Sequence, residues 1–372
     1  MRGQVEKQSR LFWTVDLEEI VPSDHPLRRV KVLCEEIFGQ MRKDFNAAYS
    51  RTGRPGIPPE QLLKALLLQA LYSIPSEIKL TESIRYNMLF RWFLDLGLER
   101  EVWTPESFSM NRCRFERYQL FRKFFDRIVS HALEGGWISE DHFTVDGTLI
   151  RSWASLKSLE PRDGSGGKVD DDDRGNPTVD FHKEKRRNET HGSRTDPEAR
   201  LARKGKGKEA HLCHSGHLLM ENRNGLCLDV QTDAADGQAE RRRAKAMLKH
   251  VKRRHGLKPK TMGADAGYDD GRFLRELEDE GIIPHVPLKR DRVVAEDPAG
   301  QARRRAKQRR KTKGYQLSQR IRKRVEEIFG WFKTVGTLAR TRFVGRWKIG
   351  QEGLITGAAY NLLRLVRLEA TG

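Results

Sequence analysis

The chain has 372 residues, of which 33% are charged and 37% hydrophobic, and its formal net charge at pH 7 is +19. This length is sufficient for a substantial buried core and favours two domains. The composition excludes a membrane span, because no apolar run reaches the ~18 residues that such a helix needs. The excess of positive charge predicts a polyanionic partner, with a merely basic or ribosome-associated protein as the alternative.

The N-terminal segment MRGQVEKQSRLFW lacks the apolar stretch of a secretory signal, and the four cysteines show no CxxC spacing. We therefore expect free thiols in a reducing cytoplasm. His211, Cys213 and His217 alternate along an expected strand, with Cys227 downstream. A structural zinc site usually needs two tight ligand pairs, and the second is missing here. These four side chains are expected to serve packing, with zinc as the less favoured alternative.

Residues 1–135 are predicted to be helical. Pro58-Pro59-Glu60 begins a helix whose leucines recur at helical spacing. Thr104-Pro105-Glu106 begins a long helix that runs to Gly135-Gly136. This helix carries several arginines, among them Arg112 and Arg114. A group of short helices with a basic last member is typical of a helix-turn-helix DNA-binding domain. A plain helical bundle with solvated arginines is an equal alternative.

Residues 155–210 form a polar insertion, with the glycine-rich run GSGG at 164–167 and four aspartates at 170–173. So few apolar residues predict a long loop or a partly disordered arm. Its many lysines and arginines either follow phosphate groups or only solvate the loop.

The remaining elements alternate in type. A strand at 142–150 is followed by two strands around Asn224-Gly225, a strong hairpin signal. Then come a helix (235–255), a strand (260–265), a helix (271–280) and a strand (282–288). Residues 303–324 contain 12 Lys or Arg and no acid, and lead into a helix. An antiparallel meander followed by strand–helix alternation predicts an α/β fold, a mixed sheet with helices on its faces, of the RNase-H-like kind.

Three carboxylates are placed where they could converge. Asp146 is expected at or near a strand end, Asp265 ends another strand, and Glu326 lies on the basic helix. Buried carboxylates are costly unless they are paired, and oxygen ligands are what Mg²⁺ prefers. A shared divalent cation would support phosphodiester chemistry on nucleic acid. Considered one at a time, the two aspartates are also explained as residues of ordinary turns, and Glu326 as one partner of a surface ion pair. Asp269, Asp270 and Glu327 are alternatives for the acidic roles.

Long motifs in order carry a family resemblance. They are HPLRRV (25–30), GRPGIPPEQLLKALLLQALY (53–72), IRYNMLFRWFLDLGL (84–98), VDGTLI (145–150), TDPEARLARKGKGKEAHL (195–212), LMENRNGL (219–226) and ADAGYDD (264–270). Over nearly its whole length the chain resembles the DDE transposases of bacterial insertion sequences, in the insertion-sequence-five (IS5-like) branch. The resemblance implies a helical DNA-end-binding domain (1–135) and an RNase-H-like catalytic domain (136–370) that contains the polar insertion.

The resemblance also implies roles for single residues. Asp146, Asp265 and Glu326 would hold Mg²⁺, with Mn²⁺ as a substitute. The family signature Tyr-x2-Arg-x3-Glu-x6-Lys is matched at Arg322, Glu326 and Lys333, but Gln319 stands at the tyrosine position. On one continuous helix these three would share a face, with Arg322, Lys333 and the nearby Arg324 on phosphates.

The activity implied is that of a transposase. Such an enzyme binds the terminal inverted repeats of its element, cleaves a strand and joins the new 3′ end to target DNA. Its partners would be DNA and further copies of the chain in a synaptic complex, on the nucleoid of a bacterial cytoplasm. A catalytically decayed DNA-binding relic and a metal-dependent nuclease are the alternatives.

Overall fold

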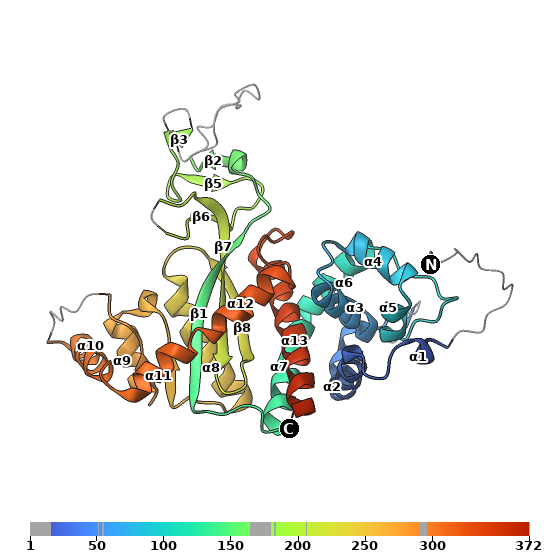
Figure 1. Cartoon of the computed structure of the whole chain (residues 1–372). Helices are drawn as coiled ribbons and strands as arrows, with labels where there is room; N and C mark the ends of the chain where they lie inside the picture. The colour runs from blue at the N-terminus through green and yellow to red at the C-terminus, as the bar shows by residue number, and fades with distance from the viewer. Residues whose placement is uncertain are drawn as a thin grey trace, which may run out of the picture.

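The computed structural model describes residues 16–50, 52–53, 56–163, 180–181, 184–205, 207–289 and 296–371. The glycine-rich run at 164–167 and the aspartates at 170–173 lie outside these ranges, as does the N-terminal segment to residue 15. Figure 1 shows a helical N-terminal part beside a sheet that is flanked by further helices, and a narrow arm that projects from one end of that sheet.

The N-terminal part is helical, as predicted. Its helices are α1 (Leu17–Ile20), α2 (Pro26–Ala48), α3 (Pro59–Leu71), α4 (Glu77–Tyr86), α5 (Met88–Phe93), α6 (Glu106–Arg117) and α7 (Leu120–Glu134). The prediction of one long helix from residue 104 was wrong, because the chain breaks between α6 and α7. Gln119 takes a left-handed conformation there, with φ 52°. The break turns α7 so that Phe121 meets Phe115 edge-on, with ring centroids 5.4 Å apart, and both rings are buried.

The sheet of the C-terminal part has a mixed order. Its strands are β1 (His142–Arg151), β6 (Arg200–Ala202), β7 (His211–Glu221), β8 (Leu226–Ala234), β9 (Thr261–Gly263) and β10 (Ile283–His285). The order is β10-β9-β1-β7, with β8 and β6 both paired to β7. β7 is antiparallel to β1 and β8, whereas β9 and β10 run parallel to β1. An antiparallel meander extended by two crossover strands confirms the predicted α/β, RNase-H-like fold.

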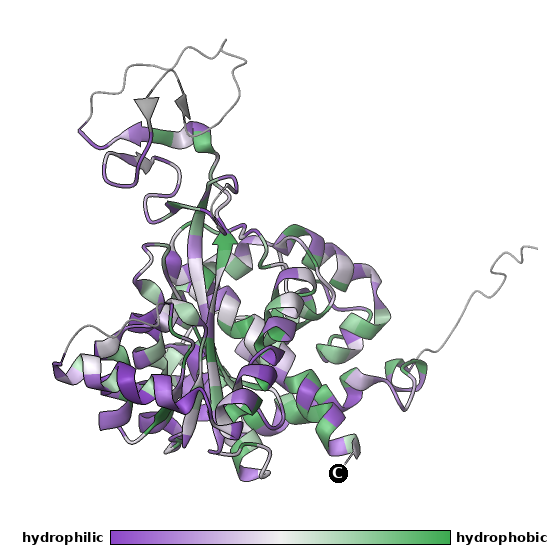
Figure 2. Cartoon of the chain, turned by 60° about the vertical axis from the view of Figure 1, so that its left-hand side comes forward, coloured by the Kyte–Doolittle hydropathy of each residue, from purple (hydrophilic) through white to green (hydrophobic). Residues whose placement is uncertain are grey.

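Helices cover both faces of this sheet. They are α8 (Ala239–His255), α9 (Gly271–Asp279), α10 (Pro298–Arg309), α11 (Lys313–Ile321), α12 (Arg324–Thr334) and α13 (Arg346–Thr371). α8 packs on β7 and β8, α12 packs on β1, and α13 packs on β8. Figure 2 shows hydrophilic and hydrophobic residues alternating along the surrounding helices, as expected for helices with one buried stripe.

Where the structure describes it, the polar insertion contains short elements of secondary structure; a long loop or a partly disordered arm was predicted. It contains the short 3₁₀ helix η1 (Leu156–Ser158) and the strands β2 (Leu159–Pro161), β3 (Asp180–Phe181), β4 (Glu184–Lys185) and β5 (His191–Ser193). β2 pairs with β5, and β3 with β4. A buried carboxylate anchors the arm to the sheet: Asp196 Oδ2 accepts from Ser152 Oγ at 2.6 Å and lies 2.8 Å from His214 Nε2.

The two halves share one hydrophobic core. Buried residues from α2, α3, α7, the sheet, α8, α9 and α13 belong to a single cluster. The last helix joins them, because α13 packs against α2, α3 and α7 as well as against β8. The proposed division near residue 135 therefore crosses a continuous core and stays a prediction. Over the part of the chain that the structure describes, no helix has both the length and the hydropathy to span a bilayer.

Candidate active site

Asp146 lies in the middle of β1, opposite Leu218 of β7, so the prediction that it ends a strand was wrong. The following glycine does not turn the chain; it provides space. A Cβ at Gly147 would lie 3.2 Å from His217 Nδ1 and 3.5 Å from Glu240 Cγ. Since neighbouring residues of a strand face opposite sides of a sheet, the Asp146 side chain points away from α8 and toward the α11–α12 junction.

Asp265 follows the parallel strand β9, as predicted. Its side chain caps the short 3₁₀ helix η2 (Ala266–Tyr268), with Oδ1 accepting from Gly267 N–H at 2.7 Å. A Cβ at Gly267 would lie 2.6 Å from Glu240 Oε2 and 2.8 Å from Asp265 Oδ1. The backbone at Gly267 is therefore wedged between two carboxylates, and only glycine fits there without moving them.

These carboxylates repel one another in a desolvated place. The pKa of Asp146 is raised to about 6, chiefly by burial and then by the negative charge of Asp265. The pKa of Glu240 is also raised, by burial first and by Asp265 second. Tyr268 is buried beside them, and its hydroxyl has no hydrogen-bond partner among the described residues. Negative charges gathered in a desolvated place in this way form a site that a bound cation would stabilise.

Arg322 supplies the positive charge nearest to Asp146, with Nη1 3.5 Å from Asp146 Oδ2. Its side chain is 17% exposed, and its Nε is buried without a partner. The turn that carries it is fixed by Asn222, which accepts from Thr144 Oγ1 at 2.8 Å and donates to the Ile321 carbonyl at 3.3 Å. The LMENRNGL motif thus links the hairpin turn, β1 and the α11–α12 junction.

The signature residues do not lie on one uninterrupted helix, contrary to the prediction. α11 ends at Ile321 and α12 begins at Arg324, so Arg322 lies in the turn between them. The turn is tight, with Glu326 N–H donating to the Lys323 carbonyl at 3.0 Å. Glu326 is exposed in the first turn of α12 and makes no side-chain hydrogen bond or ion pair within the described residues. Its part in the site stays a prediction.

Lys333 is half-buried in the last turn of α12. Burial lowers its pKa, and the nearby Lys204 ammonium adds to that effect. A lysine held close to another cation and partly desolvated is placed for an anion rather than for a protein carboxylate. The phosphate-binding role of Lys333 stays a prediction.

Gln319, at the position of the family tyrosine, has a structural contact. Its Nε2 donates to the His285 carbonyl at 2.7 Å and so holds α11 on the end of β10. Arg324 has a comparable role, donating from Nη1 to the Asn222 carbonyl at 2.9 Å, although its side chain is exposed. Both contacts position the turn that carries Arg322.

The arginines predicted for the N-terminal DNA interface differ in exposure. Arg112 is buried, with Nη2 2.6 Å from Glu77 Oε1 and its guanidinium over the Phe343 ring. It therefore does not lie on the surface and serves packing between the N-terminal helices and the C-terminal part. Arg114 is exposed and stacks on Tyr49, with 4.4 Å from Cζ to the ring centroid.

The alternative acids have other partners. Asp269 accepts from Arg303 Nε at 3.0 Å and Nη2 at 2.8 Å, and Asp270 caps α9. Burial raises the pKa of Tyr360 to about 12, and the negative charge of Glu327 acts in the same direction, so Glu327 lies near that ring. Asp269 and Asp270 thus have local structural roles, whereas Glu327 is exposed on α12.

Glu240 was missed by the sequence reasoning. It lies in the first turn of α8, and it is the one acid in a helix with eight Lys or Arg residues. That contrast was a usable signal, although an acid in a first turn is also explained by the helix dipole. The structure brings Glu240 to Asp265 and thereby adds a fourth candidate carboxylate.

A separate group joins α7 to α8. Within the described residues, Asp126, His250 and His255 are the one trio of potential ligands whose atoms all lie within 4.8 Å of one another. The two histidines lie about 15–22 Å further along α8 than its first turn, so this trio is distinct from the aspartates above. Arg254 Nε lies 3.4 Å from Asp126 Oδ2 and Arg122 Nη1 3.9 Å from Oδ1. Asp126 is already neutralised by these cations, which favours a buried polar network over a metal site.

The zinc alternative at His211, Cys213, His217 and Cys227 gains no support. Within the described residues, these side chains do not form a group of three potential ligands close enough to hold one ion.

Replacing Gly267 with Ala is expected to reduce the activity of this site at least about tenfold, because its methyl carbon would lie 2.6 and 2.8 Å from two carboxylate oxygens and both carboxylates must shift. The thermal unfolding midpoint should change little, since the atoms met are the ends of side chains. Gly39→Ala in α2 is the matched control, because nothing lies within 4 Å of its Cβ position. Equal activity of the two variants would remove Gly267 from the site.

Comparisons with known proteins agree with this architecture. Residues 15–114 match the family described as Transposase domain (DUF772), and residues 178–362 match the family described as Transposase DDE domain. The second match contains Asp265, Glu326 and Glu240, whereas Asp146 lies between the two matched segments. No curated protein matches the chain.

Two solved structures match the chain with low sequence identity and low TM-scores. The Mos1 transposase paired-end complex with left transposon end is 11% identical, with a TM-score of 0.19, over 74% of this chain and 84% of that chain. A pre-cleavage Mos1 transpososome is 13% identical, with a TM-score of 0.20, over 86% and 87%. TM-scores of this size do not establish a shared fold. The two family matches cover the helices from α1 into α6 and the sheet apart from β1, with α7 also outside them, and on them the chain belongs to the DDE transposases.

Proposed function

We propose that this protein is a DNA transposase of the IS5-like kind. It binds the terminal inverted repeats of an insertion sequence, cleaves one strand to free a 3′-OH, and joins that hydroxyl to target DNA. The observation that carries the proposal is the meeting of Asp146 and Asp265 beside the Arg322 guanidinium, at the point where β1 and β9 lie side by side.

The residues present suit a divalent cation. Asp146 and Asp265 are hard oxygen donors whose mutual repulsion a cation would relieve. Glu326 completes the set that the family signature names, and Glu240 is the competing third carboxylate. Bound Mg²⁺, or Mn²⁺ in its place, would lower the pKa of the attacking hydroxyl and stabilise the leaving oxygen.

The basic side chains have the second role. Arg322 is paired with Asp146 at 3.5 Å only weakly, so a cation at the aspartates would release its guanidinium toward a phosphate. Lys333 and the exposed Arg324 lie on the following helix and extend this positive surface. Water would be the nucleophile for cleavage and the 3′-OH for strand transfer, at one and the same site.

The partners follow from the reaction. DNA ends and target DNA must meet at the site, and pairing of two ends calls for more than one copy of the chain. The N-terminal helical part, with the exposed Arg114, is proposed to recognise the ends. Such a protein would act on the bacterial nucleoid.

The test uses a supercoiled plasmid that carries the DNA flanking the gene on both sides. We expect Mg²⁺-dependent strand breaks at the element ends and covalently joined donor–target products, with neither in the presence of EDTA. Breaks without joined products would replace the proposal by a nuclease. Specific binding without breaks, in Mg²⁺ and in Mn²⁺, would indicate a decayed DNA-binding relic.

A further inference from the structure

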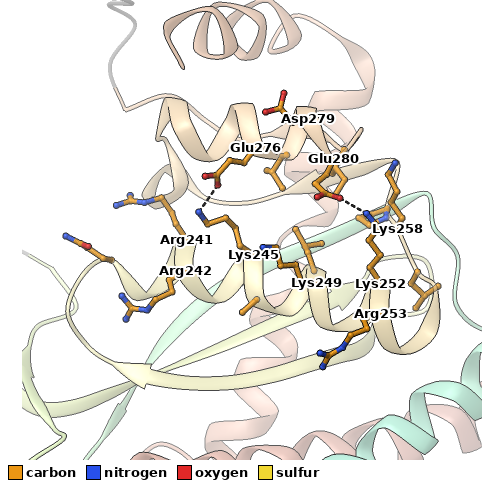
Figure 3. Close-up of a pocket in the computed structure, with 17 residues that line it drawn as sticks. Arg241, Arg242, Lys245, Lys249, Lys252, Arg253, Lys258, Glu276, Asp279 and Glu280 are labelled. Carbon is orange, nitrogen blue, oxygen red and sulfur yellow. Dashed lines mark hydrogen bonds and ion pairs between the residues drawn. The ribbon is translucent and has the colours of Figure 1, made fainter. Parts of the chain in front are cut away.

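A groove between α8 and α9 lies next to the candidate active site and has a volume of about 1020 Å³. Seven Lys or Arg residues and three acids line it (Figure 3). Its floor is apolar and includes the buried side chains of Leu248, Leu257, Leu277 and Ile282. The groove therefore has a strip of positively charged side chains along its rim and buried hydrophobic side chains at its floor.

The acids do not neutralise this strip. Lys245 is paired with Glu276 at 2.7 Å and Lys252 with Glu280 at 2.6 Å, as the dashed lines in Figure 3 show. Lys249 and Arg253 are exposed and make no ion pair within the described residues. Lysine and arginine heads without protein partners on one helix face are the footprint of a polyanion.

The groove begins at the site itself. Arg241 lines it, and the same side chain donates from Nη1 to the Gly267 carbonyl at 3.3 Å, on the residue that separates the Glu240 and Asp265 carboxylates. A chain of phosphates with one member at the aspartates would thus continue past Arg241 onto α8. The helix is about 25 Å long, which matches roughly seven phosphates of one DNA strand.

We propose that the α8–α9 groove holds the backbone of the DNA that flanks the scissile phosphate, on the same duplex that is cleaved. This inference rests on the proposed function, since it assigns one surface to its substrate. The backbone of a separate target DNA would have the same chemistry. Because the groove begins beside Asp265, the cleaved duplex is the favoured occupant. Contacts of this kind are independent of base sequence.

The experiment compares two duplexes taken from one end of the element. One stops at the terminal base pair, and the other continues into flanking sequence for longer than the groove. Binding is measured by fluorescence anisotropy at several salt concentrations, with Ca²⁺ in place of Mg²⁺. The wild-type protein should bind the longer duplex more tightly, and with a steeper salt dependence.

The test variant is Lys249→Ala with Arg253→Ala. Loss of two phosphate contacts should reduce the slope of log K against log salt on the longer duplex by about 1.8. Binding to the shorter duplex should not change. The matched control, Arg272→Ala with Arg367→Ala, removes the same charge from exposed positions outside both the groove and the N-terminal helical part, and should behave as wild type.

Equal slopes for the test variant and the wild-type protein on the longer duplex would overturn the inference. If the test variant were defective only in capturing a separate target duplex, the groove would be assigned to target DNA, and the inference would be overturned as well. Neither result affects the proposed function, which fails only if the wild-type protein binds neither end duplex or cleaves none.

Discussion

Asp146→Asn and Asp265→Asn should each reduce Mg²⁺-dependent DNA cleavage by about 10³-fold or more, while DNA affinity stays within a few-fold of wild type. Loss of a carboxylate that holds a catalytic cation removes several kcal/mol of transition-state stabilisation, and each 1.36 kcal/mol is tenfold in rate. Affinity should persist, because it depends on the many Lys and Arg residues outside the site. The measurement pairs plasmid cleavage with anisotropy on one preparation.

The third carboxylate is decided by the same assay. Glu326→Gln should be as defective as Asp146→Asn if the family signature gives the ligand set. Glu327→Gln is its matched control, because Glu327 is the adjacent glutamate and lies near Tyr360. Full cleavage by Glu326→Gln together with loss in Glu240→Gln would transfer the role to Glu240. Normal cleavage by the Asp146 variant would remove the site altogether.

Asp146→Asn should also stabilise the protein in the absence of divalent cations, by on the order of 2 kcal/mol at pH 7. The folded-state pKa of Asp146, about 6, lies above its ordinary value of 3.8. Because the pKa of this carboxyl is raised in the folded state, the free energy of unfolding of the wild-type protein is highest below pH 4. It falls as the pH rises through 6 and the buried carboxyl loses its proton. The Asn side chain has the same shape and no charge, so it avoids first the cost of burying a charge and then the repulsion from Asp265 and Glu240.

The comparison is made by thermal unfolding in EDTA between pH 4 and pH 8. The difference between variant and wild type should be near zero at pH 4 and reach its full size above pH 7. Added Mg²⁺ should raise the unfolding temperature of the wild-type protein but not of the variant. Asp141→Asn is the control, because the pKa of that exposed carboxyl is lowered by Lys260 and its loss cannot stabilise. A wild-type protein as stable as Asp146→Asn at pH 8 would contradict the predicted repulsion.

The mixed sheet with helices on its faces was predictable from the sequence because local signals agreed with it. Asn224-Gly225 marked the hairpin between β7 and β8, and the alternation that follows α8 required parallel strands. The sequence placed Asp265 correctly after a strand, because a short strand precedes it (Thr261–Gly263) and Ala266-Gly267 follow it. Asp146 was misplaced because Asp-Gly usually marks a turn. Here the glycine lies inside a strand, where the absence of a side chain leaves room for His217 and Glu240.

The other errors have one cause. Helical spacing of phenylalanines could not show the break at Gln119, since residues on both sides keep an apolar stripe. The same limit hid the interruption between Ile321 and Arg324, where the chain keeps turning but with tighter hydrogen bonds. Glu240 and the buried state of Arg112 depend on contacts between segments far apart in the chain. Composition and periodicity carry no information on such contacts.

The position of the last helix has a genetic consequence. Between Ile349 and Leu362 almost every residue of α13 is buried, because the N-terminal helices surround one side and β8 the other. A gene copy truncated just before this helix would encode a protein in which both halves expose apolar surface. Such 3′-shortened copies would yield aggregated or degraded product rather than a working DNA-binding fragment. If the proposed function holds, truncated products that regulate transposition would therefore need to retain all 26 residues of α13.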